Sequence, residues 1–313
     1  MPTTDSSPLI PYLDKVLCAD ARVVLPQLPE NSIDLVLTDP PYFLDKLDES
    51  WTPERAAPKS YKSQQVHHLP PGMKFDPSQG RRLYEWYYPI AREILRVLKP
   101  GGFFFTFASP RLFHRVACAV EDAGFFVRDT FLWVYTQSQP KAMSLHHFIR
   151  RLALPQAVKE TLHQKLQGWK TPQVKSVYEP IIVAQKPYEG TLLENFLRHQ
   201  VGLFQTEIPV GKGMFPANLL LLEETETLLD KYFLLPKAAE DLPHPTAKPV
   251  ALCEYLIELS TIPGAVVLDP FVGSGSTAVA AVRRKRHFIG IEIHSAYAEL
   301  AAKRVRETLP ALL

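Results

Sequence analysis

Residues 265–278 have the sequence AVVLDPFVGSGSTA, and this stretch decides the fold class. Its apolar start predicts a buried strand, and Gly273 and Gly275 predict a tight turn that opens a helix over residues 278–285. A second strand is predicted over residues 287–293. Strand, turn, helix and strand make a βαβ unit, whose two strands run parallel with a right-handed crossover. The stretch therefore predicts an α/β protein with a mostly parallel sheet.

The amino-terminal half repeats this alternation of strands and helices. Residues 33–38 (IDLVLT) form a predicted buried strand, which must end at the following pair of prolines because these lack backbone donors. A helix is predicted over residues 83–98, with strands over 103–107 and 125–135. Alternation at both ends of the chain indicates a doubly wound sheet with helices on both faces.

Charge is unevenly distributed, although the net charge of the 313 residues is only +2. Residues 141–186 carry eight Lys or Arg against two Glu, and they end in a predicted strand over 179–184. Residues 220–241 carry six acids against two Lys. Residues 43–82 lack any apolar periodicity and predict an unusually long loop, a kind of segment that is usually functional. The basic zone and this loop are the candidates for contact with a polyanion.

Composition excludes several classes of protein. Hydrophobic residues make up 46% of the chain, which is enough for a sizeable core. The three cysteines are far apart and form no C-x-x-C pair, which excludes a disulfide scaffold and a zinc ribbon and suits a reducing cytoplasm. The first residues do not resemble a signal peptide, and no apolar run is long enough for a membrane span.

The turn at 269–275 is a candidate ligand site. Glycines let the backbone pass close to a ligand, and the helix that follows offers free amides and the positive end of its dipole. Glu292 follows Gly273 by 19 residues, a spacing at which an acid accepts hydrogen bonds from ribose hydroxyls. Together these features predict an adenosine-containing ligand. The alternative is a tight turn that only packs the helix on the strand.

The tetrapeptide Asp39-Pro40-Pro41-Tyr42 is a second candidate site, at the carboxyl end of a predicted parallel strand. It offers a carboxylate, a carbonyl without a competing local N–H group, and an aromatic face within one stiff turn. This set suits a planar ring that bears an exocyclic amine. The alternative is an Asp-Pro turn with a packed tyrosine.

Three motifs together resemble those of the beta-class amino-methyltransferases of DNA, which use S-adenosylmethionine. Asp39–Tyr42 matches the family's D-P-P-Y motif, residues 271–275 match its F-x-G-x-G loop, and residues 244–249 (HPTAKP) resemble its third signature. The motifs occur in the beta-class order, and the resemblance covers residues 14–42, 84–136 and 178–309.

The resemblance implies a Rossmann-like methyltransferase fold with a seven-stranded sheet and an inserted target-recognition region. Residues 1–140 would hold the catalytic half with the loop at 43–82. Residues 141–243 would hold the basic insertion, including a strand near 178–186 that returns to the sheet. Residues 244–313 would hold the cofactor-binding half.

The resemblance also implies a chemistry. The Asp39 carboxylate and the Pro40 carbonyl would accept the two N–H bonds of the target amine, and Tyr42 would stack on a base flipped out of double-stranded DNA. The catalytic residues would be Asp39, Pro40, Pro41 and Tyr42, and no metal is expected. The residues expected around the cofactor are Asp20, Asp39, His244, Thr246, Lys248, Asp269, Pro270, Phe271, Gly273, Ser274, Gly275, Thr277 and Glu292. Those expected to contact DNA are Lys141, Arg150, Arg151, Lys165, Lys170 and Lys175.

Within the family, an aspartate in the first motif position favours adenine N6, and a serine favours cytosine N4. Asp39 therefore predicts an adenine-N6 methyltransferase, with cytosine N4 as the alternative. The resemblance allows a homodimer and a partner restriction endonuclease, and it leaves RNA open as a substrate.

Two hypotheses of other classes remain. A nicotinamide- or flavin-dependent oxidoreductase would use Gly273-x-Gly275-x-x-Ala278, but it leaves the tetrapeptide at 39–42 and the motif at 244–249 unexplained. A non-catalytic nucleic-acid-binding module would have no need for an intact Asp39.

Overall fold

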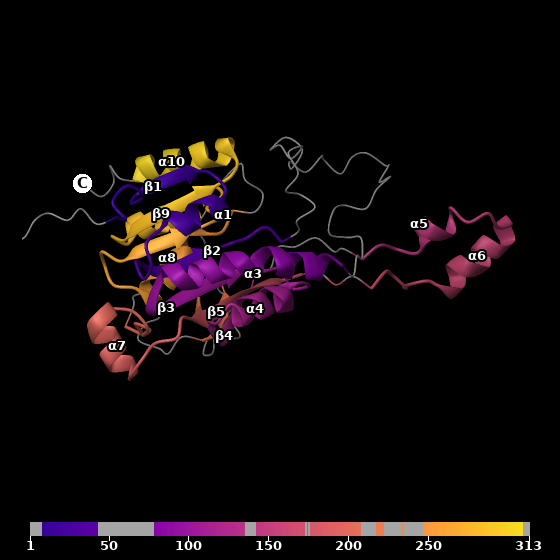
Figure 1. Ribbon diagram of the computed structural model, residues 1–313. Helices are drawn as coiled ribbons and strands as arrows, with labels where there is room; N and C mark the ends of the chain where they lie inside the picture. Colours follow the sequence, from indigo (N-terminus) through magenta and orange to yellow (C-terminus); the bar gives the residue numbers. More distant parts are fainter. Residues whose placement is uncertain are drawn as a thin grey trace, which may run out of the picture.

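The structure is a computed structural model. It describes residues 8–42, 78–134, 142–172, 174, 176–207, 217–221, 233–234 and 247–308. Most of these residues form one sheet with helices on both of its faces, and an arm projects from one end of it (Figure 1).

The strands of the described residues follow the order β1, β9, β8, β2, β3, β5, β4, β6, β7 across the sheet. Neighbouring strands are parallel, except that β5 runs antiparallel to both β3 and β4. Seven longer strands make the predicted sheet, and the short β6 and β7 extend its edge. The bounds are β1 (Lys15–Cys18), β2 (Ile33–Thr38), β3 (Leu98–Phe107), β4 (Phe126–Val134), β5 (Tyr178–Gln185), β6 (Leu219–Leu221), β7 (Phe233–Leu234), β8 (Val266–Asp269) and β9 (His287–Glu292).

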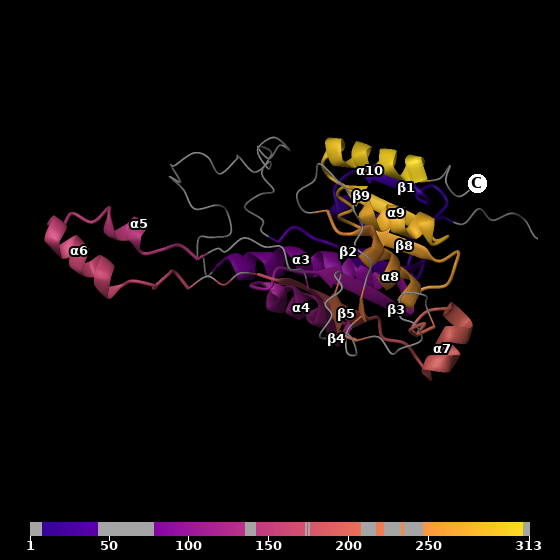
Figure 2. The ribbon, with the colours of Figure 1, turned by 180° about the vertical axis from the view of Figure 1, so that it is seen from behind.

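Helices cover both faces because the central strands are apolar on both sides. In β2, Leu35 and Leu37 join the core beneath α8 (Val250–Ser260), α9 (Ser276–Arg283) and α10 (Ser295–Thr308). Val36 joins the core of the opposite face, beneath α1 (Ala21–Val24), α3 (Gln79–Val97) and α4 (Phe113–Asp122). Figures 1 and 2 view these two faces from opposite sides. A short 3₁₀ helix, η1 (Leu25–Gln27), follows α1, and α7 (Leu192–His199) follows β5.

The predicted elements are largely confirmed, with clear differences at β3, which begins at Leu98 rather than at 103, and at α3. This helix begins at Gln79 rather than at 83, inside the stretch that was expected to be loop. Its first turn packs closely on α4: a Cβ atom added at Gly80 would lie only 3.1 Å from Cγ of Arg115 in that helix. The rest of the expected loop, residues 43–77, and most of the acidic stretch at 220–241 lie outside the described residues.

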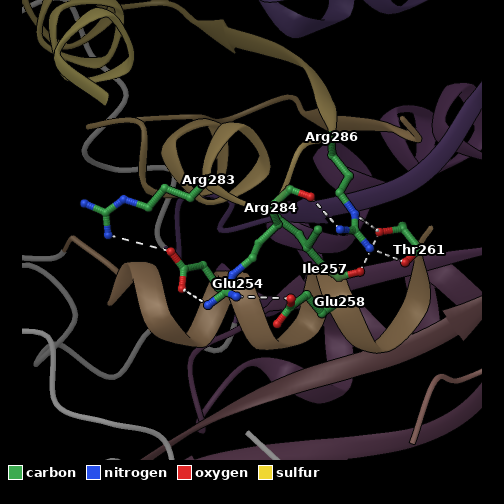
Figure 3. Close-up of polar contacts among 7 residues, drawn as sticks. All are labelled: Glu254, Ile257, Glu258, Thr261, Arg283, Arg284 and Arg286. Carbon is green, nitrogen blue, oxygen red and sulfur yellow. Dashed lines mark hydrogen bonds and ion pairs between the residues drawn. The ribbon is translucent and has the colours of Figure 1, made fainter. Parts of the chain in front are cut away.

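Polar contacts fasten α8 to the carboxyl end of α9 (Figure 3). Arg284 pairs with Glu254 at 2.6 Å and with Glu258 at 3.1 Å, and both carboxylates are mostly buried. Arg286 donates hydrogen bonds to the Thr261 hydroxyl and carbonyl. These contacts fix the two helices whose amino-terminal ends border the candidate site.

The chain between β4 and β5 leaves the sheet as an arm, residues 142–172. It carries α5 (His146–Ile149) and α6 (Gln156–Lys165), which project away from the sheet in both views (Figures 1 and 2). A bridge between Ser144 and Lys170 pairs the outgoing and returning chain. No residue of α6 is buried, and most of its residues are exposed to solvent. None of the described helices has the length and apolar character needed to cross a membrane.

Candidate active site

The carboxyl ends of β2 and β8 lie side by side in the middle of the sheet. The Thr38 hydroxyl at the end of β2 donates a 2.6 Å hydrogen bond to Asp269 Oδ1 at the end of β8. From these strands the chain departs in opposite directions, through α3 to β3 and through α9 to β9. Such a switch point is where open α/β sheets bind ligands. Asp39 and the turn at 269–275 therefore follow neighbouring strand ends.

Asp269 is the buried link between these two ends. Burial raises its pKa to about 7, even though the Thr38 and Thr277 side chains and the Phe271 amide donate hydrogen bonds that favour the carboxylate. The Asp269 carboxyl group therefore holds the start of the turn in place through these hydrogen bonds.

Four side chains form a cluster just beyond the end of β2: Asp39, Tyr42, Glu179 and Lys248. The Lys248 ammonium makes a short ion pair with Asp39 Oδ2 and lies 3.1 Å from Glu179 Oε2. The Tyr42 hydroxyl donates a 2.8 Å hydrogen bond to the same Glu179 oxygen. The cluster joins residues that are up to 209 positions apart in the chain.

Burial and charge fix the protonation of two members of the cluster. Burial alone would lower the pKa of Lys248, which is 8% exposed, but the Asp39 and Glu179 carboxylates outweigh it and raise that pKa above its ordinary value. Burial, together with the same two carboxylates, also raises the pKa of Tyr42 well above its usual range. Lys248 is therefore a cation and Tyr42 a neutral donor at physiological pH.

Asp39 Oδ1 is the atom of the cluster that remains open. It is buried and has no hydrogen-bond partner among the described residues. A buried, unpaired acceptor costs about 1–3 kcal/mol, so in a native protein it calls for a partner such as a bound ligand, a water or an ion. Pro40 and Pro41 follow directly, so the acceptor stands in a backbone segment that lacks donors of its own.

The glycine turn has the geometry expected of a ligand cradle. Gly273 and Gly275 both have positive φ angles, +51° and +89°. A Cβ at Gly273 would meet nothing nearer than the Phe271 carbonyl oxygen at 3.9 Å, so the space beside it is open. The Gly273 amide donates a 3.0 Å hydrogen bond to Glu292 Oε2, and burial raises the pKa of Glu292.

Other predicted cofactor residues surround this turn. The Ser274 carbonyl accepts a 2.6 Å hydrogen bond from Arg304. Thr277, in the first turn of α9, is buried and bonds Asp269. Phe271, one residue after Pro270, lies 5.5 Å from the Trp86 ring of α3, measured between centroids. Asp20 stands at the end of β1 beside β9, where it caps α1 and pairs with Arg22 at 2.6 Å.

His244 and Thr246 lie outside the described residues, whereas Lys248 reaches Asp39 itself. Lys141 and Lys175 also lie outside them. Arg150, Arg151, Lys165 and Lys170 are exposed on the arm.

The sequence alone missed Glu179 and the part played by Thr38. The sequence marks Glu179 only as the first residue of a predicted strand. Because β5 runs antiparallel, its beginning lies at the edge where the parallel strands end. An acid at the start of a strand would have been a signal only if the direction of that strand were known.

Comparison with known proteins agrees with this geometry. The family model for N6/N4 methyltransferases, described as DNA methylase, matches residues 33–303. The Type II methyltransferase M.HindIII of Haemophilus influenzae is 28% identical, over 94% of this chain and 95% of its own length.

Solved structures share the fold. TTHA0409 of Thermus thermophilus, a putative DNA modification methylase complexed with S-adenosyl-L-methionine, has a TM-score of 0.54 at 21% identity, over 95% of this chain and 94% of its own. The cytosine-N4-specific PvuII DNA methyltransferase has a TM-score of 0.52 at 19% identity, over 94% and 89%. Because the family model spans most of the chain, including both the tetrapeptide and the glycine turn, the protein belongs to the N6/N4 DNA methylase family.

Proposed function

We propose that this protein transfers a methyl group to the N6 amine of an adenine flipped out of double-stranded DNA. The family makes it an S-adenosylmethionine-dependent DNA methyltransferase, and this removes the oxidoreductase alternative. The choice of base and the roles of individual residues are the proposal. The observation that carries it is the buried, unpaired Asp39 Oδ1 at the sheet's switch point.

The residues around the glycine turn fit S-adenosylmethionine. The open space beside Gly273 admits a ligand close to the backbone, and Ser276 Oγ is buried without a hydrogen-bond partner among the described residues. Glu292 suits ribose hydroxyls, and Asp20 and Phe271 would border the adenine. When bound, the cofactor supplies an electrophilic methyl group on a sulfonium. We propose that the methionine end of the cofactor is bound by Lys248, together with His244 and Thr246 of the same motif.

The residues at 39–42 would prepare the amine. Its lone pair is delocalised into the purine ring, which makes the nitrogen a poor nucleophile. Hydrogen bonds from its two N–H groups to Asp39 Oδ1 and the Pro40 carbonyl favour a pyramidal nitrogen and stabilise the positive charge that develops there. Tyr42 would stack on the base and fix the line of approach.

Adenine is preferred because the first residue of the tetrapeptide is Asp39, whereas serine favours cytosine N4 in this family. The fold does not choose the base, since the cytosine-N4-specific PvuII enzyme shares it. Cytosine N4 is therefore the alternative that the experiment must test.

The arm, within the predicted recognition region at 141–243, is the proposed DNA contact. Its exposed Arg150, Arg151, Lys165 and Lys170 can pair with phosphates. The Type II relatives support the proposal of a partner restriction endonuclease that acts at the same DNA sequence. A homodimer is a separate expectation, tested by sedimentation. The free Cys18, Cys118 and Cys253 suit action in a reducing cytoplasm.

Unmodified DNA incubated with methyl-labelled cofactor tests the proposal directly. Digestion to nucleosides should place the label in N6-methyladenine, and methylation-sensitive sequencing should show one recognition sequence. Label in N4-methylcytosine would overturn the choice of base. Label in RNA but not in DNA would overturn the choice of polymer.

A further inference from the structure

The cluster at Asp39 contains more charged side chains than the binding of an amine requires. The proposed chemistry uses one carboxylate, yet the cluster holds a second one, Glu179, which is 19% exposed. Glu179 comes from β5, the antiparallel strand, whereas Asp39 follows β2 and Lys248 precedes α8. Three separate elements therefore converge to place two carboxylates on one ammonium.

Glu179 has contacts to two partners that surround Asp39. A single oxygen, Oε2, accepts from the Tyr42 hydroxyl at 2.8 Å and faces the Lys248 ammonium at 3.1 Å. The ammonium also lies 5.5 Å from the centre of the Tyr42 ring and 5.1 Å from that of Phe107. The position of Lys248 is thus set by Glu179 and two aromatic faces, in addition to Asp39.

This arrangement leaves Asp39 with one occupied and one open oxygen. Lys248 occupies Oδ2, and Oδ1 is the buried acceptor without a partner among the described residues. An ammonium that paired with Asp39 alone would be free to move between its two oxygens. An ammonium shared with Glu179 is held on the Oδ2 side. Its charge is also divided between two carboxylates, so Asp39 remains a stronger acceptor for a third group.

We propose that Glu179 is a positioning residue for methyl transfer, which holds Lys248 and Tyr42 so that Asp39 Oδ1 stays open to the target amine. The inference rests on the proposed function, because it gives Asp39 Oδ1 the amine as its ligand. Glu179 acts through its neighbours and touches neither base nor cofactor.

Glu179→Gln is the matched substitution, since it keeps the shape of the side chain and an oxygen for Tyr42 but removes the charge that faces Lys248. Its single-turnover rate of methyl transfer should fall about tenfold to a hundredfold, the loss expected when reacting groups are misplaced by up to about 1 Å. The affinity for S-adenosylhomocysteine, by calorimetry, and the Tm should stay close to those of the wild type. Glu307→Gln, which neutralises an exposed carboxylate on α10, is the control for loss of charge.

A double-mutant cycle separates positioning from a purely structural role. If Glu179 acts through Lys248, Glu179→Gln should change the rate less than about twofold in a Lys248→Met background. If Glu179→Gln alone folds poorly, the double variant compared with Lys248→Met still tests the proposal, because a loss of about tenfold or more there would show that Glu179 acts independently of Lys248 and would overturn it. Tyr42→Phe measures how much of the effect of Glu179 on the rate depends on its hydrogen bond with the Tyr42 hydroxyl.

The inference is overturned if Glu179→Gln keeps a rate within about twofold of the wild type, or if its loss is undiminished in the Lys248→Met background. Asp39→Ala, assayed in parallel, distinguishes this failure from that of the proposed function. If Asp39→Ala is inactive and Glu179→Gln is unaltered, only the inference fails. If Asp39→Ala is fully active, the proposed catalytic site fails as well.

Discussion

Asp269 shows how a single carboxyl group can organise the junction of two strands. It receives hydrogen bonds from Thr38 at the end of β2, from the Phe271 amide in the turn and from Thr277 in α9. The same burial that makes these contacts strong penalises the ionised form. The residue that shapes the cofactor turn is therefore also a source of pH-dependent stability.

We predict that Asp269→Asn becomes more stable relative to the wild type as the pH rises from 4 to 8. The pKa of Asp269 is about 7 in the folded protein against an unfolded value of 3.8, so the folded state retains a proton that the unfolded chain loses. The stability that this proton provides is complete below about pH 4 and is lost as the pH rises through 7. Asparagine does not titrate, so the difference in unfolding free energy should shift in its favour by about 4 kcal/mol, the value that corresponds to a pKa difference of about 3.

Urea denaturation at four pH values between 4 and 8 measures this shift. Asp14→Asn, at a half-exposed carboxylate, is the control for removing an acid elsewhere. A difference between Asp269→Asn and the wild type that is the same at every pH would show that the carboxyl group titrates normally.

At the scale of elements, the glycine turn and α10 fit closely together. Gly275 has a φ of +89°, and a Cβ there would lie 2.9 Å from both Cα and Cβ of Ala301 in α10. Gly264, in the loop before β8, has a similar φ of +83° but open space around it. These two glycines therefore separate backbone strain from steric overlap.

Gly275→Ala should lower the unfolding free energy by about 2–4 kcal/mol, the sum of about 1 kcal/mol for the positive φ and the cost of moving α10. It should also weaken the binding of S-adenosylhomocysteine, because the turn cannot keep its shape. Gly264→Ala should lose only about 1 kcal/mol and bind normally. Equal losses of stability and affinity in the two variants would mean that the contact with α10 does not shape the turn.

The arm is the proposed DNA contact, and we expect its exposed Arg and Lys side chains to carry that role. Replacing Arg150, Arg151, Lys165 and Lys170 with glutamine should weaken DNA binding and reduce the slope of log K against log salt by about 0.9 for each phosphate that the arm no longer neutralises. Lys303→Gln, at an exposed lysine of α10, should leave the slope unchanged. An unaltered slope in the arm variant would show that these four side chains do not contact DNA phosphates.

At the scale of the whole molecule, the sequence predicted what is locally encoded. Strand β2 has its predicted bounds, Ile33–Thr38, because its residues are buried throughout and the prolines after Asp39 end it. The first turn of α3 was missed, since Gln79 and Gly80 carry no apolar signal although both are buried, Gln79 beside Arg111 and Gly80 beside Arg115.

The site was predicted in part for the same reason. The tetrapeptide at 39–42 and the turn at 269–275 are each continuous in sequence, so their residues could be named before they were brought together. Glu179 could not be, because its place depends on the antiparallel pairing of β5 with β3 and β4. Long-range pairing of this kind leaves no local pattern.

The central claim is that the strand ends of β2 and β8 form one site in which Asp39 accepts the target amine beside a separately held cofactor. Asp39→Ala tests it most directly, through calorimetric binding of S-adenosylhomocysteine and single-turnover methyl transfer to DNA by the same preparation. We predict that the affinity stays within about threefold of the wild type, while the rate falls by at least about a thousandfold. A variant that binds the cofactor product normally and still methylates DNA at near the wild-type rate would contradict the account.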